Sequence, residues 1–401
     1  MNPGFRFFHC AILAAAWACT AAAQAPHIRI VGVGAEKTTL SLAGLQAGSS
    51  EAERLFLLTL QRDLEQSGWF NLAGATAAIQ VSGVVSPASV TCAVRNSGDG
   101  QMYFNRVFAE PGLSPRQQAH RVSDAIVEAV KKTPGIASLR VAMIGARAGK
   151  RDLYVCGMDG EDLVQLTRDG APCLAPNWYP DAQALVYTSM HRGFPDVYRV
   201  DLRSLSRTGI SSHPGINAGA TISPDGREMA LALSKDGNPE LYVTELRTGA
   251  LTRLTKTRGA AEASPSWSPD GRRLAYVSDA TGAPQVYVIG RGGGHATRLT
   301  FRGNENVSPD WGRDGRIAYS SKRQGRYQIC VYDPDTRVET QVTTEYVDHE
   351  APSWTPDGRH ILVERTVAYH TDVYLLDTLG DPPVRLTRLQ GDWYAPACAP
   401  R

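Results

Sequence analysis

The sequence lacks the features of several large classes of protein. It has no Gly-x-Ser-x-Gly elbow, no Walker loop and no His-Glu-x-x-His helix, so common hydrolase, nucleotide-binding and zinc-protease motifs are missing. Its 42 Lys and Arg residues nearly balance its 40 Asp and Glu residues, which argues against a nucleic-acid-binding protein. No apolar run of about 18 residues follows the N-terminal segment, so we expect no membrane-spanning body.

Cysteine is scarce, with seven residues in 401. Their spacings match no zinc-binding pattern, so the sequence predicts no metal site and no cofactor. We expect most of them to be small buried hydrophobic residues. Whether Cys173 pairs with Cys398 stays open at this point.

The first 23 residues have the pattern of a secretory signal peptide. Arg6 supplies a positive charge, residues 7–18 are apolar but too short to span a bilayer, and three alanines at 21–23 offer a cleavage site. We therefore expect a mature chain that begins at Gln24 and is exported.

A repeat of 43 to 45 residues occupies the chain from about residue 138 to its end. Each copy closes on a β-branched or leucine residue, in most copies followed by threonine. The first residues of these pairs are Leu166, Ile210, Leu254, Leu299, Val342 and Leu386. A Pro-Asp-Gly turn marks most of the same copies and favours a tight connection between strands.

The repeat predicts a six-bladed β-propeller over residues 138–401. The fullest copy contains four short strand signals, at residues 263–268, 273–278, 285–289 and 296–300, which is typical of one blade. The first copy lacks its innermost strand, and residues 393–398 have the pattern of the missing piece. We therefore expect the C-terminal strand to close the ring.

Residues 24–134 have a different sequence pattern from the repeat, and this pattern predicts a small α/β domain. Helical periodicity appears at residues 50–66, where Ser50 can cap the helix, and again at residues 115–132. Strand signals lie at residues 27–33, 78–85 and 101–108. The chain is thus mainly β, with an α/β domain ahead of the propeller.

One position of the repeat is a candidate binding ring. It lies at the start of each predicted innermost strand, beside the loop that comes from the preceding blade, and such loops open on one face of a propeller. We call these the six ring positions, and they are Cys173, Asn217, Glu262, Asn306, His349 and Trp393. The alternative is that Asn217 and Asn306 only cap turns, and that Trp393 only packs under the closing strand.

Three segments give the chain a resemblance to a known family. Residues 63–70 and 116–141 of the N-terminal domain, and the blade motif at residues 265–276, resemble the TolB family of periplasmic propeller proteins of the Tol–Pal system. The resemblance implies a non-enzymatic periplasmic scaffold that supports outer-membrane integrity and cell division. It also implies that the lipoprotein Pal docks on the propeller, and the candidate contacts are Asn217, Glu262, Asn306, His349 and Trp393, with neighbours Ile216, Ala263 and Glu350.

The mature N-terminus resembles the family's TolA-binding segment only in residues 28–31, which include Ile28 and Ile30. The resemblance implies TolA as a second partner there, with a monomeric chain inside the complex. If exposed, His349 would make docking pH-dependent near a pKa of about 6.5. Two rivals stay open. One is an enzyme acting on glycans, which would need paired carboxylates, although no second acid is evident beside Glu262 or Glu350. The other is a sensor with a small molecule in its channel.

Overall fold

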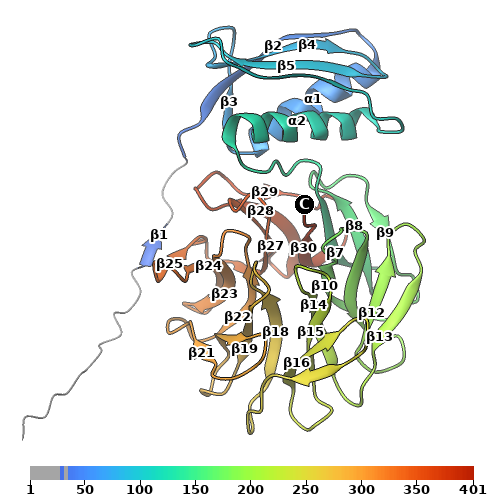
Figure 1. The fold of residues 1–401 in the computed structure, drawn as a ribbon, viewed down its shortest axis with the longest axis vertical. Helices are drawn as coiled ribbons and strands as arrows, with labels where there is room; N and C mark the ends of the chain where they lie inside the picture. The colour runs from blue at the N-terminus through green and yellow to red at the C-terminus, as the bar shows by residue number, and fades with distance from the viewer. Residues whose placement is uncertain (1–27, 31–34) are drawn as a thin grey trace, which may run out of the picture.

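Seven β-sheets and two α-helices form the described part of the chain. The structure, a computed structural model, describes residues 28–30 and 35–401. Six sheets are arranged as a ring of blades, and the seventh belongs to a small domain above the ring (Figure 1). The prediction of a mainly β fold with a six-bladed propeller and a small α/β domain is confirmed. The signal peptide expected at residues 1–23 lies outside the described residues.

Each blade is a four-stranded antiparallel sheet whose innermost strand lines the central channel. Blades are numbered here in chain order. Their strands, from innermost to outermost, are β30 (Asp392–Cys398), β7 (Arg140–Arg147), β8 (Lys150–Gly157) and β9 (Val164–Gln165) in blade 1; β10 (Cys173–Trp178), β11 (Ala184–Ser189), β12 (Asp196–Asp201) and β13 (Arg207–Ser211) in blade 2; β14 (Asn217–Ile222), β15 (Glu228–Leu233), β16 (Glu240–Glu245) and β17 (Leu251–Arg253) in blade 3; β18 (Glu262–Trp267), β19 (Arg273–Ser278), β20 (Gln285–Gly290) and β21 (Thr297–Arg298) in blade 4; β22 (Asn306–Trp311), β23 (Ile317–Arg323), β24 (Arg326–Asp333) and β25 (Val338–Gln341) in blade 5; and β26 (Asp348–Trp354), β27 (His360–Val367), β28 (His370–Asp377) and β29 (Val384–Arg385) in blade 6.

The C-terminal strand closes the ring as the sequence predicts. Strand β30 pairs antiparallel with β7 and completes blade 1 from the far end of the chain. Closure matters because the inner edge of β7 would otherwise expose unpaired backbone groups, a template for aggregation. The same strand ties neighbouring blades together, since the indole Nε1 of Trp178 in blade 2 donates to the carbonyl of Ala397 at 2.9 Å.

Every innermost strand contains a bulge that the sequence repeat does not reveal. The pairing with the second strand shifts register at the same place in all six blades, and the first of the two residues inside each shift has a positive φ. These residues are small, which suits the crowded channel where six strands converge. They are Ala175, Gly219, Ser264, Ser308, Ala351 and Ala395.

The N-terminal domain packs two helices on one face of a five-stranded sheet. The sheet order is β3 (Phe70–Leu72), β2 (Thr38–Ala47), β4 (Ile79–Val85), β5 (Val90–Asn96) and β6 (Met102–Phe108). Helices α1 (Glu51–Gln66) and α2 (Pro115–Lys131) each begin with a capping box, at Ser50 and Ser114 respectively, in which the serine side chain accepts from the third residue. The capping by Ser50 is as the sequence predicts.

A short strand from the N-terminus extends blade 5. Strand β1 (Ile28–Ile30) pairs in parallel with β25, the outermost strand of that blade, so the sheet there has five strands. The outer edge of a blade can thus accept an additional extended segment.

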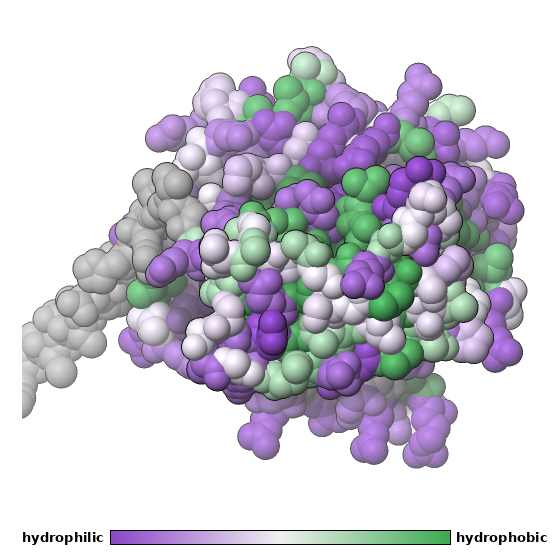
Figure 2. Space-filling model, turned by 90° about the horizontal axis from the view of Figure 1, so that it is seen from above, coloured by the Kyte–Doolittle hydropathy of each residue, from purple (hydrophilic) through white to green (hydrophobic). Residues whose placement is uncertain are grey.

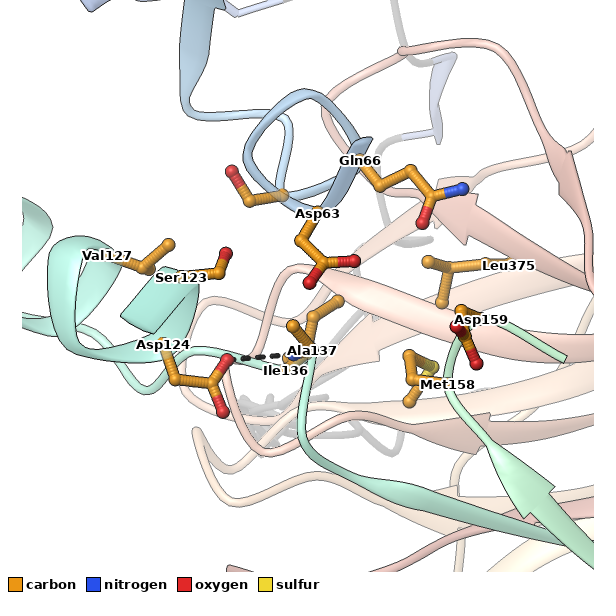
Figure 3. Close-up of a pocket in the computed structure, with 11 residues that line it drawn as sticks. Asp63, Gln66, Ser123, Asp124, Val127, Ile136, Ala137, Met158, Asp159 and Leu375 are labelled. Carbon is orange, nitrogen blue, oxygen red and sulfur yellow. Dashed lines mark hydrogen bonds between the residues drawn. The ribbon is translucent and has the colours of Figure 1, made fainter. Parts of the chain in front are cut away.

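A buried ionic cluster joins the two domains. The carboxylate of Asp159, in the turn between β8 and β9, lies 2.7 Å from a guanidinium nitrogen of Arg62 and 2.6 Å from one of Arg116. His120 lies between Asp159 and Asp63, and its Nδ1 is 2.6 Å from the Asp63 carboxylate. Figure 3 shows Asp63 and Asp159 reaching toward the same small cavity from opposite domains. We call these five residues the interdomain cluster.

The N-terminal domain lies at the rim of the ring, beside blades 1 and 6 (Figure 1). Its contacts fall on the turn after β8 and on the turns of blade 6. There the guanidinium of Arg359 lies 4.3 Å from the centre of the Trp69 ring, and Lys37 pairs with Asp381 at 2.8 Å. The loops at the opposite end of the channel are therefore available to other molecules.

Candidate functional site

The candidate site is the propeller face turned away from the N-terminal domain, which we call the open face. Two kinds of loop form it. One leads from the outermost strand of a blade to the innermost strand of the next blade, and the other joins the second and third strands of a blade. These loops are 148–149, 166–172, 190–195, 212–216, 234–239, 254–261, 279–284, 299–305, 324–325, 342–347, 368–369 and 386–391. The open face also includes the strand residues that adjoin them.

Exposed apolar side chains gather on the open face. Nine of the sixteen large hydrophobic residues exposed in the described part of the chain lie there. All four exposed aromatic residues are among them, and Tyr369 is 99% exposed. Such concentrations mark sites where proteins bind one another. The nine are Leu174, Met190, Phe194, Ile216, Phe301, Tyr346, Val367, Tyr369 and Leu389.

Two of these aromatic side chains are held in place by stacked arginines. The guanidinium of Arg298 lies 5.0 Å from the centre of the Phe301 ring, and that of Arg326 lies 5.1 Å from the Tyr346 ring. Arg326 is itself fixed by Asp348, at 2.9 Å. A ring held in one orientation loses little freedom on binding, which suits it as an anchor.

The hydrophobic face is not repeated on the N-terminal domain. Figure 2, which looks onto that domain from above, shows hydrophobic side chains mixed with many hydrophilic ones. Its sheet exposes Val84, Met102 and Val107, but the described part of the domain has no exposed aromatic side chain of comparable size. The open face therefore differs in kind from this surface.

The six ring positions lie at the open face, as expected, but their side chains are buried. None is more than 1% exposed. Asn217 explains why. Its side-chain oxygen accepts from Ser211 Oγ and His213 N, both at 2.8 Å, and its nitrogen donates to the carbonyls of His213 and Gly215. Asn217 therefore holds the loop 212–216 in position through hydrogen bonds and does not itself form the binding surface.

The other ring positions also serve the loops or the packing. Asn306 donates to Gln285 Oε1 and to the carbonyl of Arg302, both at 2.8 Å. The Trp393 indole donates to the carbonyl of Leu389 at 3.2 Å. It also packs edge-on against Tyr154, with 5.3 Å between the two ring centres. The packing alternative for Trp393 and the capping alternative for Asn306 both agree with these contacts.

Burial also changes the titration of two ring positions. Desolvation lowers the pKa of His349 to about 4, so the ring is neutral near pH 7. The condition for a pH-dependent contact near 6.5, an exposed His349, is therefore not met. Burial raises the pKa of Glu262, whose carboxylate accepts from Thr257 and from Ser278 Oγ.

The predicted neighbours of the ring positions are the more accessible residues. Ile216 and Ala263 are exposed and Glu350 is half-buried, beside the mouth of the channel. Cys173 and Cys398 are both free thiols, so these two do not pair. Ile28 and Ile30 belong to β1, whose backbone lies on the outer edge of blade 5, away from the channel.

A pair of carboxylates lies in the wall of the channel. Glu350 on β26 and Glu364 on β27 are directly opposite in the antiparallel pairing, so the expectation that no second acid lies beside Glu350 is wrong. Glu364 accepts a hydrogen bond from the backbone N–H of Ala395 at 2.5 Å, which ties blade 6 to the closing strand. Burial, with the nearby Glu350, raises the pKa of Glu364 to about 7.

This raised pKa makes a testable prediction about stability. An acid whose pKa is higher in the folded state stabilises the fold below its unfolded pKa of about 4.3, and that contribution is lost as the pH rises through about 7. We expect Glu364→Gln to raise the free energy of unfolding at pH 8 by about 1–3 kcal/mol and to change it little at pH 4. Chemical denaturation at both pH values measures this. The exposed Glu245→Gln serves as control, and an equal effect of Glu364→Gln at both pH values would contradict the account.

Among the described residues, no group of three or more metal-ligating side chains is placed to hold an ion. No helix in the described ranges is both long enough and apolar enough to cross a bilayer.

Comparison with known proteins identifies the family. The family model of the TolB β-propeller domain matches residues 127–401, more than half of the chain. The chain belongs to the TolB family. Among curated relatives, the Tol-Pal system protein TolB of Desulfosudis oleivorans is 33% identical over 159 residues, and that of Alcanivorax borkumensis is 32% identical over 138. These segments cover 40% and 33% of this chain, and 36% and 32% of the two relatives.

Solved structures of TolB proteins extend the likeness beyond the propeller. The crystal structure of TolB from Acinetobacter baumannii matches with a TM-score of 0.82 and 26% identity, covering 93% of this chain and 99% of the other. A putative TolB from Agrobacterium tumefaciens matches with a TM-score of 0.54 and 24% identity, covering 63% and 91% respectively, which supports the fold alone. The TolB resemblance seen in the sequence is thus confirmed over both domains.

Proposed function

We propose that this protein is a non-enzymatic periplasmic scaffold of the Tol–Pal system. In this role it binds the lipoprotein Pal on the open face of the propeller and TolA through its N-terminal segment. It thereby links layers of the envelope and supports outer-membrane integrity and cell division. Membership of the TolB family supports a role in the Tol–Pal system, because the curated relatives carry the name Tol-Pal system protein TolB.

The observation that carries the docking proposal is the cluster of exposed aromatic side chains on the open face. Phe194, Phe301, Tyr346 and Tyr369 project from loops on a closed and rigid ring. Aromatic residues dominate the energy of protein interfaces because they bury much area at little entropic cost. A scaffold that holds another protein needs such a surface, whereas a catalyst needs reacting groups within a cleft.

The proposed contact set differs from the one the repeat suggests. Ile216, Ala263 and Glu350 remain proposed contacts, because they reach the surface beside the channel. Asn217, Glu262, Asn306, His349 and Trp393 are buried, so we assign them the task of holding the loops in position.

The proposal for TolA concerns the segment that contains Ile28 and Ile30. Its backbone forms β1 on the outer edge of blade 5, in a three-residue pairing with β25. So short a pairing is easily exchanged for another strand, which is the property required of a segment that engages a second protein.

Binding to the soluble domain of Pal from the same organism tests the docking proposal. We expect the full chain to bind it in isothermal titration calorimetry, and Phe301→Glu and Tyr369→Glu each to weaken binding at least about tenfold, because a charge is placed in an apolar contact. Val107→Glu is the matched control, since Val107 on the N-terminal domain is 65% exposed, as Phe301 is. Binding that is absent, or equally weakened by Val107→Glu, would contradict the proposal.

A turnover assay separates the enzymatic rival. A glycan-cleaving enzyme could use the carboxylate pair of Glu350 and Glu364 in the channel wall. Turnover of an oligosaccharide by the full chain, lost in Glu364→Gln, would favour that rival over the scaffold.

A further inference from the structure

A continuous trough runs along the outside of the propeller, beyond the proposed Pal site. Three adjoining cavities of about 430, 310 and 310 Å³ form it. The first two share the linker residues Leu139 and Arg140, and the second and third share Leu166 and Leu205. The trough begins between helix α2 and the C-terminus, follows the outer edges of blades 1 and 2, and ends beside the loop 166–172 of the open face.

The floor of the trough is apolar and partly exposed. Val155, Leu166 and Leu202 line it, and Val164 and Leu205 project from its sides. Outside the open face, the described part of the propeller exposes three large hydrophobic side chains, Val164, Leu205 and Leu379, so two of the three belong to the trough. Leu205 is 50% exposed and has a φ of 56°, a backbone conformation unfavourable for leucine. An apolar side chain kept exposed at a strained position suggests a function for that side chain.

Unpaired arginines surround this floor. Three of the trough arginines have a carboxylate partner, with Arg121 near Glu110, Arg207 on Asp169 and Arg401 on Glu128. Three others, Arg106, Arg140 and Arg168, have no carboxylate partner among the described residues. Of these, Arg140 already donates to the carbonyl of Ala182 and stacks on the Trp178 ring, which leaves Arg106 and Arg168 for a ligand.

The trough is lined by six arginines and five acidic side chains in all. Asp124 is buried and bonds to the linker through Ala137 N and Ser138, and Asp162 is the one acidic side chain there without a bonded partner in the described structure. The main-chain oxygen of Arg401 at the C-terminus is bonded by Arg313. The total charge of the trough is therefore nearly balanced, and the groups that favour acidic ligands are the individual arginines without a carboxylate partner, Arg106 and Arg168.

A free sheet edge runs beside the trough. Strand β9, the outermost strand of blade 1, pairs with β8 on one side and with no described strand on the other. The corresponding edge in blade 5 is occupied, because β1 adds to β25 in parallel. An outer blade edge in this protein thus already accepts an extended segment, and main-chain pairing on such an edge is a common mode of peptide recognition.

We propose that the trough binds an extended segment of a partner protein that carries alternating apolar and acidic side chains, and that this segment adds to β9 as a fifth strand of blade 1. Its apolar side chains contact Val164 and Leu205, and its carboxylates pair with Arg106 and Arg168. The trough reaches the open face, so a protein docked on that face can extend such a segment into it. The trough itself is independent of the identity of the protein on the open face.

Model peptides test this proposal with the full chain. The probes are fluorescein-labelled peptides of equal length, one of alternating valine and glutamate and one of alternating valine and lysine, and fluorescence anisotropy measures binding. We expect the glutamate peptide to bind at least about tenfold more tightly, with affinity falling as salt is added. Leu205→Glu and Arg168→Glu should each weaken its binding about tenfold. Leu379→Glu, which alters a 41% exposed side chain on blade 6, should leave binding unchanged.

Several results would overturn the proposal. One is equal binding of the two peptides, and another is binding that Leu205→Glu and Arg168→Glu leave unchanged. Loss of binding in Phe301→Glu would place the peptide on the open face instead. Self-association in analytical ultracentrifugation that Leu205→Glu abolishes would show that the trough accepts a second copy of the chain. Because these tests do not use Pal, a failure of the proposed Pal binding is distinguishable from a failure here.

Discussion

Replacing Asp159 by alanine is expected to lower the free energy of unfolding by about 3–5 kcal/mol, the usual effect of breaking a buried ion pair. Its carboxylate is shared by Arg62, Arg116 and His120, and only 3% of the side chain is exposed. Removal leaves Arg62, Arg116 and His120 with Asp63 as the one remaining carboxylate of the interdomain cluster. Denaturant unfolding, followed by the fluorescence of Trp69 at the domain interface, measures the loss.

The effect should also depend on pH. Burial alone would lower the pKa of His120, but hydrogen bonds to Asp159 and Asp63 raise it to about 9. Burial opposes the ionisation of Asp159 as well, yet hydrogen bonds from His120 and Arg116 hold its pKa well below the usual range. The contribution of His120 is therefore fully present below a pH of about 6.5 and is lost as the pH rises through about 9.

A matched exposed acid gives the control for this prediction. Glu245 is the last residue of β16, and its 39% exposed side chain lies 3.6 Å from the guanidinium of Arg247. Glu245→Gln should therefore change stability by less than about 1 kcal/mol. If Asp159→Ala proves no more harmful than Glu245→Gln, the interdomain cluster does not hold the domains together.

Deleting residues 392–401 should abolish cooperative unfolding of the propeller. The deletion removes β30, so blade 1 loses its innermost strand and β7 presents an unpaired edge to the channel. It also removes Trp393, a fully buried side chain, and the carbonyl of Ala397 that bonds Trp178. Losses of this kind exceed the total stability of a typical domain, about 5–15 kcal/mol. Differential scanning calorimetry measures the transition.

A shorter deletion separates closure from other roles of the C-terminus. Removing Arg401 alone breaks its exposed ion pair with Glu128 and keeps β30, so stability should fall by no more than about 1 kcal/mol. A cooperative transition in the longer deletion, close to that of the full chain, would show that the ring does not depend on its C-terminal strand.

The propeller can be predicted from the sequence because every blade has the same packing and turn requirements. Each blade solves the same packing problem, so the turn residues and the β-branched strands recur every 43 to 45 residues and reinforce one another. The closing strand is predictable for the same reason, since residues 393–398 match a piece that the first copy lacks. In the N-terminal domain, both helices are predicted closely because each carries its own capping serine and apolar stripe.

Other parts of the fold depend on contacts distant in sequence. The sequence analysis predicts no strand over Thr38–Ala47 or Val90–Asn96, yet β2 and β5 are interior strands of the sheet. Strand β2 contains Gly44 and two alanines and is held by parallel pairing with β4, which no local signal announces. The interdomain cluster likewise brings Asp63 and Asp159 together across nearly a hundred residues.

The candidate site, too, is predictable from the sequence only in part. The repeat locates the open face but not the accessible side chains, because whether Asn217 or Ile216 faces solvent depends on how each loop folds over the strand. The exposed aromatic residues, such as Phe194 and Tyr369, lie in loops that differ from blade to blade and so leave no periodic signal. Their position between the strands of the repeat is the one sequence feature that could have found them, since these loops are not enriched in aromatic residues.

Amide hydrogen exchange of the full chain, with and without the soluble domain of Pal, tests the central claim most directly. The account predicts slower exchange on binding in the open-face loops 190–195, 299–305, 342–347 and 368–369, and unchanged exchange in the sheet of the N-terminal domain. Protection confined to that sheet, or no protection at a saturating concentration of Pal, would contradict it.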